Sequence, residues 1–194
     1  KTGLVRLVPV ADSEGRAALV VQPKRHVPAK TSALQILHTW HYVIMKALKS
    51  PRCQERGVIL VGDFGGAAFG NLDLRVPKAI LGAIGKAVPL RLHRACIIRP
   101  FLLMRLVLPI IKMFMSEKLR QRLQVLGGPQ DLEKYGVDMK KLPSDVGGTG
   151  GEQAHDYEAM LEQWIKEEGE EQKQKEKLSS EVKENAETAT ATPQ

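Results

Sequence analysis

Short apolar runs alternate with longer mixed stretches along the first two thirds of the chain. Runs rich in β-branched residues at 4–10, 17–21 and 57–61 predict strands. A turn sequence beginning at Asp12 separates the first two, so they are expected to form a hairpin. The runs 57–61 and 95–98 are apolar throughout, which is typical of central strands covered on both faces.

Helical periodicity fills the segments between these strands. Thr31 or Ser32 can cap a helix that runs to about Leu48. Further helices are predicted at 74–86, across the apolar segment 101–115, and at 117–126, where Gly127 breaks the pattern. Strands that alternate with helices predict an α/β fold, with a β-sheet covered by helices.

The compact body is expected to end near the glycine-rich residues 147–151. Residues 1–151 are therefore predicted to form one domain. Residues 152–167 contain a clean apolar face beginning at Tyr157 and predict an amphipathic helix that docks on this body. Residues 168–194 mix Glu, Lys and Gln with few apolar side chains, which predicts an acidic, disordered tail.

The charge is divided unevenly between body and tail. The whole chain carries a net charge of +7. Residues 152–194 contain 5 Lys and Arg against 12 Asp and Glu, a net of −7, which leaves +14 for residues 1–151. A basic body favours an anionic partner, either nucleic acid or acidic lipid headgroups. Aromatic residues make up only 5% of the chain, so the stacking side chains typical of nucleic-acid binding are scarce and no nucleic-acid partner is expected.

Patterns that carry catalysis or metal binding are not found in this sequence. Cys53 and Cys96 form no zinc motif and predict two buried thiols in a reducing compartment. His38 and His41 are spaced as helical metal ligands, but no acidic or Cys partner follows them. The Asp63-Phe64-Gly65 triplet lacks the other kinase signatures. We therefore expect no enzyme activity, no metal and no cofactor.

The apolar segment 101–115 has two interpretations. It is too short for a membrane span and is interrupted by Arg105, Pro109 and Lys112. A helix this apolar is normally buried in a core. Alternatively, it closes over an apolar cavity and lies in a membrane interface when open, with its basic neighbours against anionic headgroups.

Several short motifs occur in order along the chain. They are Asp63-x-x-Gly66, Pro89-Leu90-Arg91, Ile97-Ile98-x-Pro100, Ser116-Glu117-Lys118-Leu119-Arg120-Gln121-Arg122-Leu123 and Leu142-Pro143-Ser144-Asp145-Val146-Gly147-Gly148-Thr149. Their order and spacing, over about residues 4 to 165, resemble the CRAL-TRIO lipid-binding domain family. The greatest likeness is to the branch of alpha-tocopherol transfer protein and cellular retinaldehyde-binding protein.

This resemblance implies a mixed, mostly parallel sheet covered by helices, with an apolar ligand cavity and a mobile gate helix at 101–115. The cavity and gate residues then expected are Val58, Leu60, Ile97, Phe101, Leu103, Val107, Ile110 and Phe114. Arg91, Lys118 and Arg122 align with the positions by which the tocopherol branch binds phosphoinositide headgroups. Family members usually carry a helical domain upstream, and we expect this chain to lack that domain.

Two positions depart from the family pattern. Arg99 stands where the family commonly has Asn, and residues 112–115 replace a Lys-Pro-Phe-Leu sequence. An arginine fits poorly beside a purely apolar ligand, so an acidic partner for Arg99 is the expected alternative.

The function that the resemblance implies is that of a cytoplasmic, transiently membrane-associated carrier. It would hold one small hydrophobic lipid, a terpenoid such as tocopherol or a retinoid, or a phospholipid, and exchange it at membranes that contain phosphoinositides. Two alternatives remain at this point: a phosphatidylinositol or phospholipid transfer protein, and a protein-interaction module that carries no lipid. The sequence leaves the oligomeric state open.

Overall fold

The computed structural model describes residues 2–83, 90–102, 104–150 and 157–190. The chain divides into two compact units, Lys1–His155 and Asp156–Gln194. The first unit contains the sheet and most of the helices, and the second contains a single long helix.

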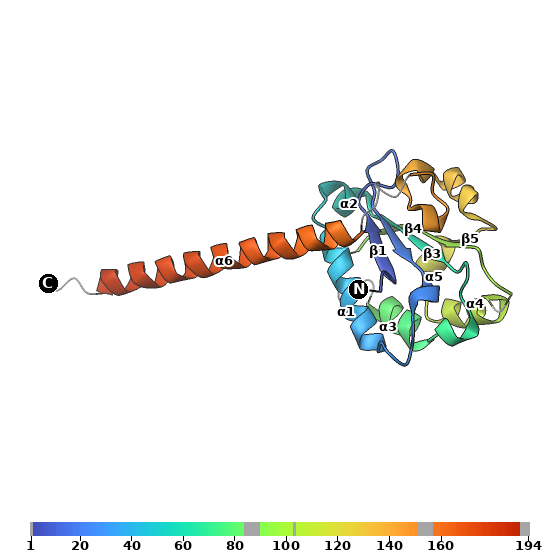
Figure 1. Cartoon of the computed structure of the whole chain (residues 1–194), viewed down its shortest axis with the longest axis horizontal. Coiled ribbons are helices and arrows are strands. Elements are labelled where there is room, and N and C mark those ends of the chain that lie inside the picture. The colour runs from blue at the N-terminus through green and yellow to red at the C-terminus, as the bar shows by residue number, and fades with distance from the viewer. Residues whose placement is uncertain (1, 84–89, 103, 151–156, 191–194) are drawn as a thin grey trace. The chain divides into compact units, whose positions relative to one another are not determined.

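A five-stranded sheet forms the centre of the first unit (Figure 1). Its strands are β1 (Val5–Val8), β2 (Ala18–Val21), β3 (Val58–Asp63), β4 (Leu92–Ile98) and β5 (Leu123–Val125), and they lie side by side in that order. β1 pairs with β2 in the antiparallel sense, whereas the pairs from β2 to β5 are parallel. The predicted α/β fold with a mixed, mostly parallel sheet is thereby confirmed.

Both faces of the sheet are apolar, because successive side chains point to opposite faces and the central strands are apolar at successive positions. Ile59 and Val61 of β3 point to one face, where they pack with Cys96 and Ile98 of β4. This face is closed by 3₁₀ segments, η3 (Pro129–Tyr135), η4 (Met139–Lys141) and η5 (Ser144–Val146). These segments and the residue after η4 contribute the fully buried side chains of Leu132, Val146 and Leu142.

Helices lie on the opposite side of the sheet: α1 (Ala33–Ala47), α3 (Arg75–Ala83) and α4 (Met104–Met113) (Figure 1). Of the two predicted caps, Thr31 and Ser32, the structure has Ser32 as the cap of α1. Its hydroxyl accepts from the Gln35 backbone, and the Gln35 side chain accepts from the Ser32 backbone. A short helix, α2 (Pro51–Arg56), leads into β3 and was not predicted.

The predicted helix 117–126 is a helix for only half of its length. α5 spans Glu117–Gln121, and the chain then enters β5. The Ala95 backbone donates to the Arg122 carbonyl and the Leu126 backbone donates to the Ile97 carbonyl, so both bonds tie this segment to β4. Pairing with a strand that is distant in sequence overrides the local helical pattern.

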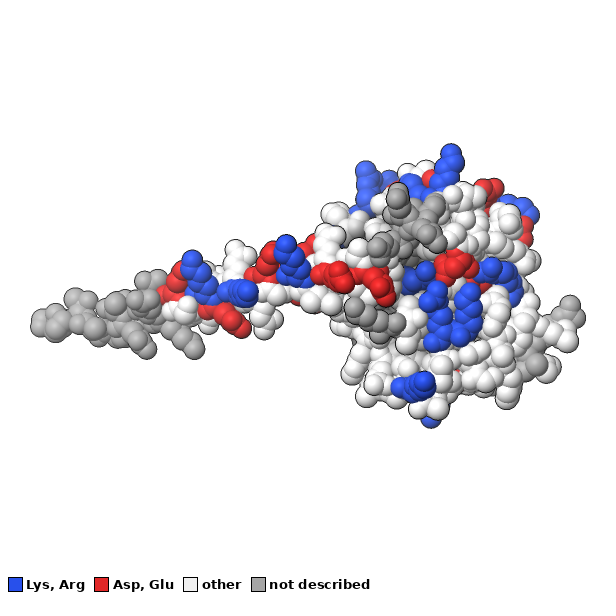
Figure 2. All heavy atoms as spheres, in the orientation of Figure 1, with Lys and Arg blue, Asp and Glu red and all other residues white. Residues whose placement is uncertain are grey.

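The second unit is α6, which runs from Tyr157 to Thr190. The structure thus continues the helix well past residue 167, where the sequence predicted disorder. Glu, Lys and Gln are strong helix formers, and the Lys177–Glu181 ion pair lies at the i, i+4 spacing that supports a helix. Acidic and basic side chains are interspersed along α6 (Figure 2). The expected docking of residues 152–167 stays a prediction, and its first residues lie outside the described ranges.

Candidate functional site

An apolar cavity of about 200 Å³ lies between the sheet and the helices that cover it. The sheet contributes Leu60 and Ile97, and α4 contributes Val107, Leu108 and Ile111. Apart from a few polar groups, the wall is made of aliphatic and aromatic side chains. Such a wall excludes ions and favours a hydrophobic guest.

Three of the eight expected cavity residues line this cavity: Leu60, Ile97 and Val107. Val58 is fully buried within the sheet and does not reach the lining. Phe101 is half-buried and packs beside Phe64, with 6.3 Å between the ring centroids.

Two further expected residues, Ile110 and Phe114, do not line the cavity. Each is 39% exposed. The Phe114 ring lies 5.7 Å from the ammonium nitrogen of Lys78 on α3, a cation–π contact. Leu103 falls outside the described residues.

Much of the wall comes from elements that the sequence did not assign to the site. α1 contributes Ile36 and Trp40, which share a helix face at i, i+4, and α3 contributes Val76 and Ile80. Helical periodicity predicted the helix, but it contained no signal that the Ile36 and Trp40 face lies against a cavity.

Both sides of α4 are apolar, and they have different surroundings. Met104 and Val107 are buried, at 2% and 7% exposure. Leu106 and Met113 project outward, at 71% and 79% exposure. Lys112 of α4 is exposed as well. A helix that presents apolar and basic side chains to solvent has a surface suited to a membrane interface. No helix within the described ranges is long and apolar enough to cross a membrane.

The three expected headgroup residues border the cavity wall. Arg91, Lys118 and Arg122 each precede a leucine that lines the cavity, namely Leu92, Leu119 and Leu123. Arg91 and Lys118 are exposed. Arg122 is half-buried, because its guanidinium donates to the Leu92 carbonyl. The structure therefore brings the Arg122 side chain to the backbone beside Arg91.

Positive charge extends around this border. Burial lowers the pKa of His93, and the nearby guanidinium groups of Arg16, Arg94 and Arg122 lower it further, against the opposing effect of Asp12. The three guanidinium groups close to His93 indicate a locally positive potential. Anions are attracted to such a surface.

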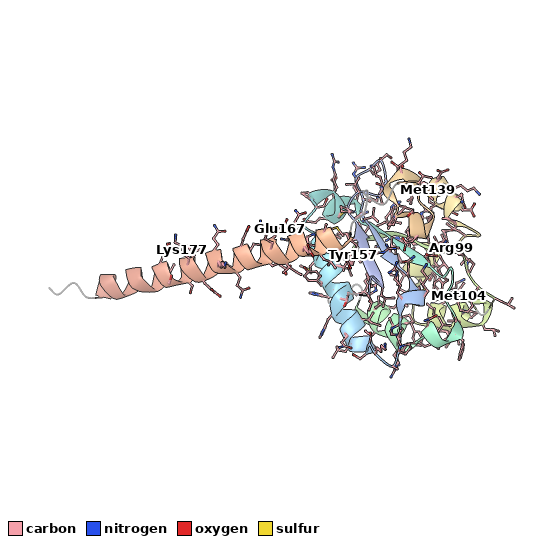
Figure 3. All side chains as sticks on the ribbon, viewed as in Figure 1. Arg99, Met104, Met139, Tyr157, Glu167 and Lys177 are labelled. Atoms are coloured by element: carbon pink, nitrogen blue, oxygen red, sulfur yellow. The ribbon has the colours of Figure 1, made fainter. Side chains whose placement is uncertain are left out.

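Arg99 points away from the cavity and into a polar cluster at the carboxyl ends of the strands. Its guanidinium donates to both carboxylate oxygens of Asp63 and, at 2.9 Å, to the Asp145 carbonyl. The expected acidic partner of Arg99 is therefore Asp63. Figure 3 shows Arg99 between Met104 and Met139, at the end of β4.

The rest of this polar cluster joins β1 and β2 to the same carboxylates. Gln22 donates to Asp63 at 2.8 Å and accepts from Arg6, also at 2.8 Å. Arg6 in turn pairs with Asp145 at 2.9 Å. Although burial alone would raise the pKa of Asp145, hydrogen bonds and positive charge from Arg6 and Arg25 hold that pKa below its ordinary value. We refer to Arg6, Gln22, Arg25, Asp63, Arg99 and Asp145 as the polar cluster.

The backbone of Arg99 adopts a conformation that is unusual for a residue with a side chain. Arg99 has a φ of 50°, in the left-handed region, which Asn adopts more readily than other residues with a side chain. The bonds to Asp63 and Asp145 hold Arg99 in this costly conformation.

The glycine pair of the Leu-Pro…Gly-Gly motif is also explained by geometry. Gly147 has a φ of 96°, and a Cβ there would overlap with Pro129. A Cβ at Gly148 would overlap with the Leu142 carbonyl. The motif thus closes the 3₁₀ segments tightly against the sheet, and its role is structural.

Both cysteines are buried, as the sequence predicted. Cys53 and Cys96 are both free and buried, and burial raises the pKa of the Cys96 thiol to about 11. Within the described residues, His, Cys, Asp and Glu side chains form no group of three able to hold a metal ion.

The chain is similar to known proteins over its first unit. A family model described as CRAL/TRIO domain matches residues 2–148. Tyrosine-protein phosphatase non-receptor type 9 of Mus musculus is 24% identical over 147 residues, which are 76% of this chain and 24% of that protein. Alpha-tocopherol transfer protein-like of Homo sapiens is 21% identical over 154 residues, 78% of this chain and 45% of that protein.

A crystal structure of Sfh5 superposes with a TM-score of 0.62 at 18% sequence identity. The match covers 84% of this chain and 64% of that one. It supports the fold alone. The chain spans a quarter to less than half the length of the two curated relatives named above.

Proposed function

Since the chain belongs to the CRAL/TRIO domain family, whose members bind and transfer lipids, we propose that it is a lipid carrier. It holds one hydrophobic lipid in the cavity beneath α4 and exchanges this lipid at membranes that contain phosphoinositides. The observation that carries the proposal is that α4 has two apolar sides, one in the cavity wall and one exposed.

In this proposal, α4 is a gate. When the gate is closed, Val107 and its neighbours complete the cavity wall. When the gate is open, Leu106 and Met113 enter the membrane interface and the cavity faces the bilayer. Each leucine that leaves water gains about 1.5–3 kcal/mol, so a few such side chains offset the loss of packing on opening.

The basic residues beside the cavity wall make lipid release depend on the membrane. Arg91, Lys118 and Arg122 contact anionic headgroups only when the molecule lies on a membrane. A ligand shifts an equilibrium through its differential affinity for the two states, so headgroups that bind better to the open state favour release there.

Transfer between vesicles tests this function. A variant with Lys118→Ala and Arg122→Ala is expected to transfer lipid to phosphoinositide vesicles at the slower rate seen with zwitterionic vesicles. A variant with Lys140→Ala and Lys141→Ala, on η4, is the control and should transfer normally. Thermal melting shows whether the first variant stays folded without the Arg122 bond. A folded first variant with unchanged transfer would contradict the headgroup role.

Vesicle binding tests the gate separately. Leu106→Glu places a charge on the exposed side of α4, where it disfavours entry into hydrocarbon. We expect vesicle binding to weaken at least about tenfold, which corresponds to a loss of about 1.4 kcal/mol in binding free energy. Leu34→Glu on α1, at 60% exposure, is the matched control and should bind normally. Equal binding by the two variants would exclude α4 as the membrane contact.

Extraction of the purified protein with organic solvent, followed by mass spectrometry, tests carriage itself. A lipid in stoichiometric amount supports the carrier. A protein that is empty and also fails to load from vesicles contradicts it.

A further inference from the structure

The two halves of α4 are held differently. Met104 and Val107, in the first half, are buried in a hydrophobic cluster with Ile97 of β4. In the second half, Ile110 is 39% exposed and Met113 is 79% exposed. Packing against the sheet therefore fixes the first half of α4 more firmly than the second.

Pro109 lies at the junction of these two halves. Proline has no backbone N–H, so the helix lacks one hydrogen bond to the carbonyl four residues earlier, and the proline ring crowds the preceding turn. Helices bend at such positions. The second half of α4 can therefore swing about Pro109 while the first half stays packed.

A cation–π contact joins the end of α4 to α3. The ammonium nitrogen of Lys78 on α3 lies 5.7 Å from the centre of the Phe114 ring. Phe114 directly follows α4, and its N–H donates to the Ile111 carbonyl at 3.1 Å, so the ring moves with the helix. Ile111 and Met115, on either side of Phe114 along the chain, line the cavity. A contact that holds Phe114 therefore also holds this part of the cavity wall.

The Lys78 ammonium is open to an anion that arrives from solvent. The Lys78 side chain is exposed, and within the described ranges it forms no ion pair. Asp73, which precedes α3, is already paired with Arg75 at 2.8 Å. A phosphate or carboxylate carries a full negative charge, whereas the face of an aromatic ring offers only its quadrupole. An anionic group beside Lys78 therefore competes well against Phe114.

From this geometry, and resting on the proposed function, we propose that Lys78 and Phe114 form a latch that keeps the second half of α4 closed in solution. An anionic lipid headgroup pairs with Lys78 at the membrane and releases Phe114. The freed ring enters the membrane interface together with Met113, and the cavity opens on the side of Met115. An exposed cation–π contact shifts an equilibrium by only about twofold to fivefold, so headgroups can overcome the latch.

Thiol labelling measures the latch without any lipid. Met115 is 6% exposed in the cavity wall, so a Met115→Cys thiol reacts with N-ethylmaleimide when the second half of α4 opens. The native thiols of Cys53 and Cys96 are buried and give the background rate. Adding Lys78→Met, which keeps an apolar stem but removes the charge, should raise labelling about twofold to fivefold. Lys140→Met, at an exposed position of η4, is the matched control and should leave the rate unchanged.

A double-mutant cycle shows whether Lys78 acts through the ring. Phe114→Leu keeps an apolar side chain but removes the π face, so it should also raise the labelling rate. In the Phe114→Leu protein, Lys78→Met should then have no further effect, because the contact that it removes is already lost. Labelling of Lys78→Met at the wild-type rate, or independent effects of the two substitutions, would overturn the latch.

Transfer of a fluorescent phosphatidylcholine tests release by headgroups. With zwitterionic acceptor vesicles, Lys78→Met should transfer this lipid about twofold to fivefold faster than the wild type, because its gate is no longer latched. Vesicles that contain phosphatidylserine should accelerate the wild type more than Lys78→Met. Slower transfer by Lys78→Met to zwitterionic vesicles would show that Lys78 is a membrane contact and not a latch.

Inorganic phosphate, compared with chloride at equal ionic strength, separates a free anion from a headgroup. It should leave wild-type transfer to zwitterionic vesicles unchanged, and acceleration equal to that by phosphatidylserine would refute release by the membrane. A wild-type protein that transfers no lipid would count against the carrier function. The labelling rates would then still decide the latch, so the two failures are distinguishable.

Discussion

Replacing Asp63 with Asn tests whether the polar cluster holds the carboxyl ends of the strands together. The Asp63 side chain is completely buried. Its two oxygens accept from Arg99, from Gln22 at 2.8 Å and from the Gly65 backbone at 3.0 Å. Asn keeps the shape of the side chain but removes its charge and turns one acceptor into a donor. That donor then faces N–H groups, and Arg99 loses its anionic partner.

The size of the expected loss in the free energy of unfolding follows from the burial of this ion pair. Removing one member of a buried ion pair costs about 3–5 kcal/mol, because the remaining charge stays poorly solvated. The Arg99 side chain is 34% exposed, so water compensates it in part, and we expect a loss near the lower end, about 3 kcal/mol. This is a large share of the roughly 5–15 kcal/mol by which domains of this kind are stable. With a urea dependence of about 2 kcal/mol per molar, the midpoint should fall by about 1.5 M.

Equilibrium unfolding in urea, followed by circular dichroism, measures this change. Asp131→Asn is the matched control, since Asp131 pairs at 2.7 Å with Lys134, whose side chain is 74% exposed. Exposed pairs contribute about 0–1 kcal/mol, so the control should stay close to the wild type. If Asp63→Asn and Asp131→Asn shifted the midpoint equally, the polar cluster would not have the structural role that its geometry indicates.

Further predictions concern pH and backbone geometry. Burial lowers the pKa of both His26 and His93, so as the pH falls below about 6.5 the unfolded chain binds protons first and the free energy of unfolding decreases. Replacing both histidines with Phe should flatten the decline in melting temperature between about pH 6.5 and pH 5. Gly148→Ala should lower the melting temperature strongly because the new Cβ overlaps with a backbone carbonyl, whereas Gly70→Ala, with open space around it, should not.

Local patterns were sufficient where the structure depends on neighbouring residues. The Ser32 capping box, the apolar run of β3 and the apolar character of α4 are all visible within a few positions of sequence. Arg99 shows the limit of prediction from local sequence. Its chemistry predicted an acidic partner, and Asp63 is that partner. The identity of this acid depends on the parallel pairing of β3 with β4, because that pairing brings together Asp63 and Arg99, which are 36 residues apart in sequence.

Features that depend on tertiary packing could not be predicted in this way. Residues 123–125 are too few for a strand signal, and they form β5 only because β4 offers an edge. Ile36 and Trp40 carry an ordinary helical pattern, which does not distinguish a face against a core from a face against a cavity. Lys78 belonged to no motif, and only the packing of α3 beside α4 brings its ammonium to the Phe114 ring.

The alternation along β3 has a consequence for how such a protein changes over evolutionary time. Ile59 and Val61 belong to the packed core, whereas Leu60 and Gly62, one position away, line the cavity. Substitutions at positions 60 and 62 reshape the guest's surroundings and leave Ile59 and Val61 of the folding core unchanged. A library randomised at 60 and 62, with 59 and 61 kept, should therefore yield mostly folded variants with altered guest preferences. Neighbouring residues of one strand thus allow ligand specificity to evolve without a change in the residues that determine stability.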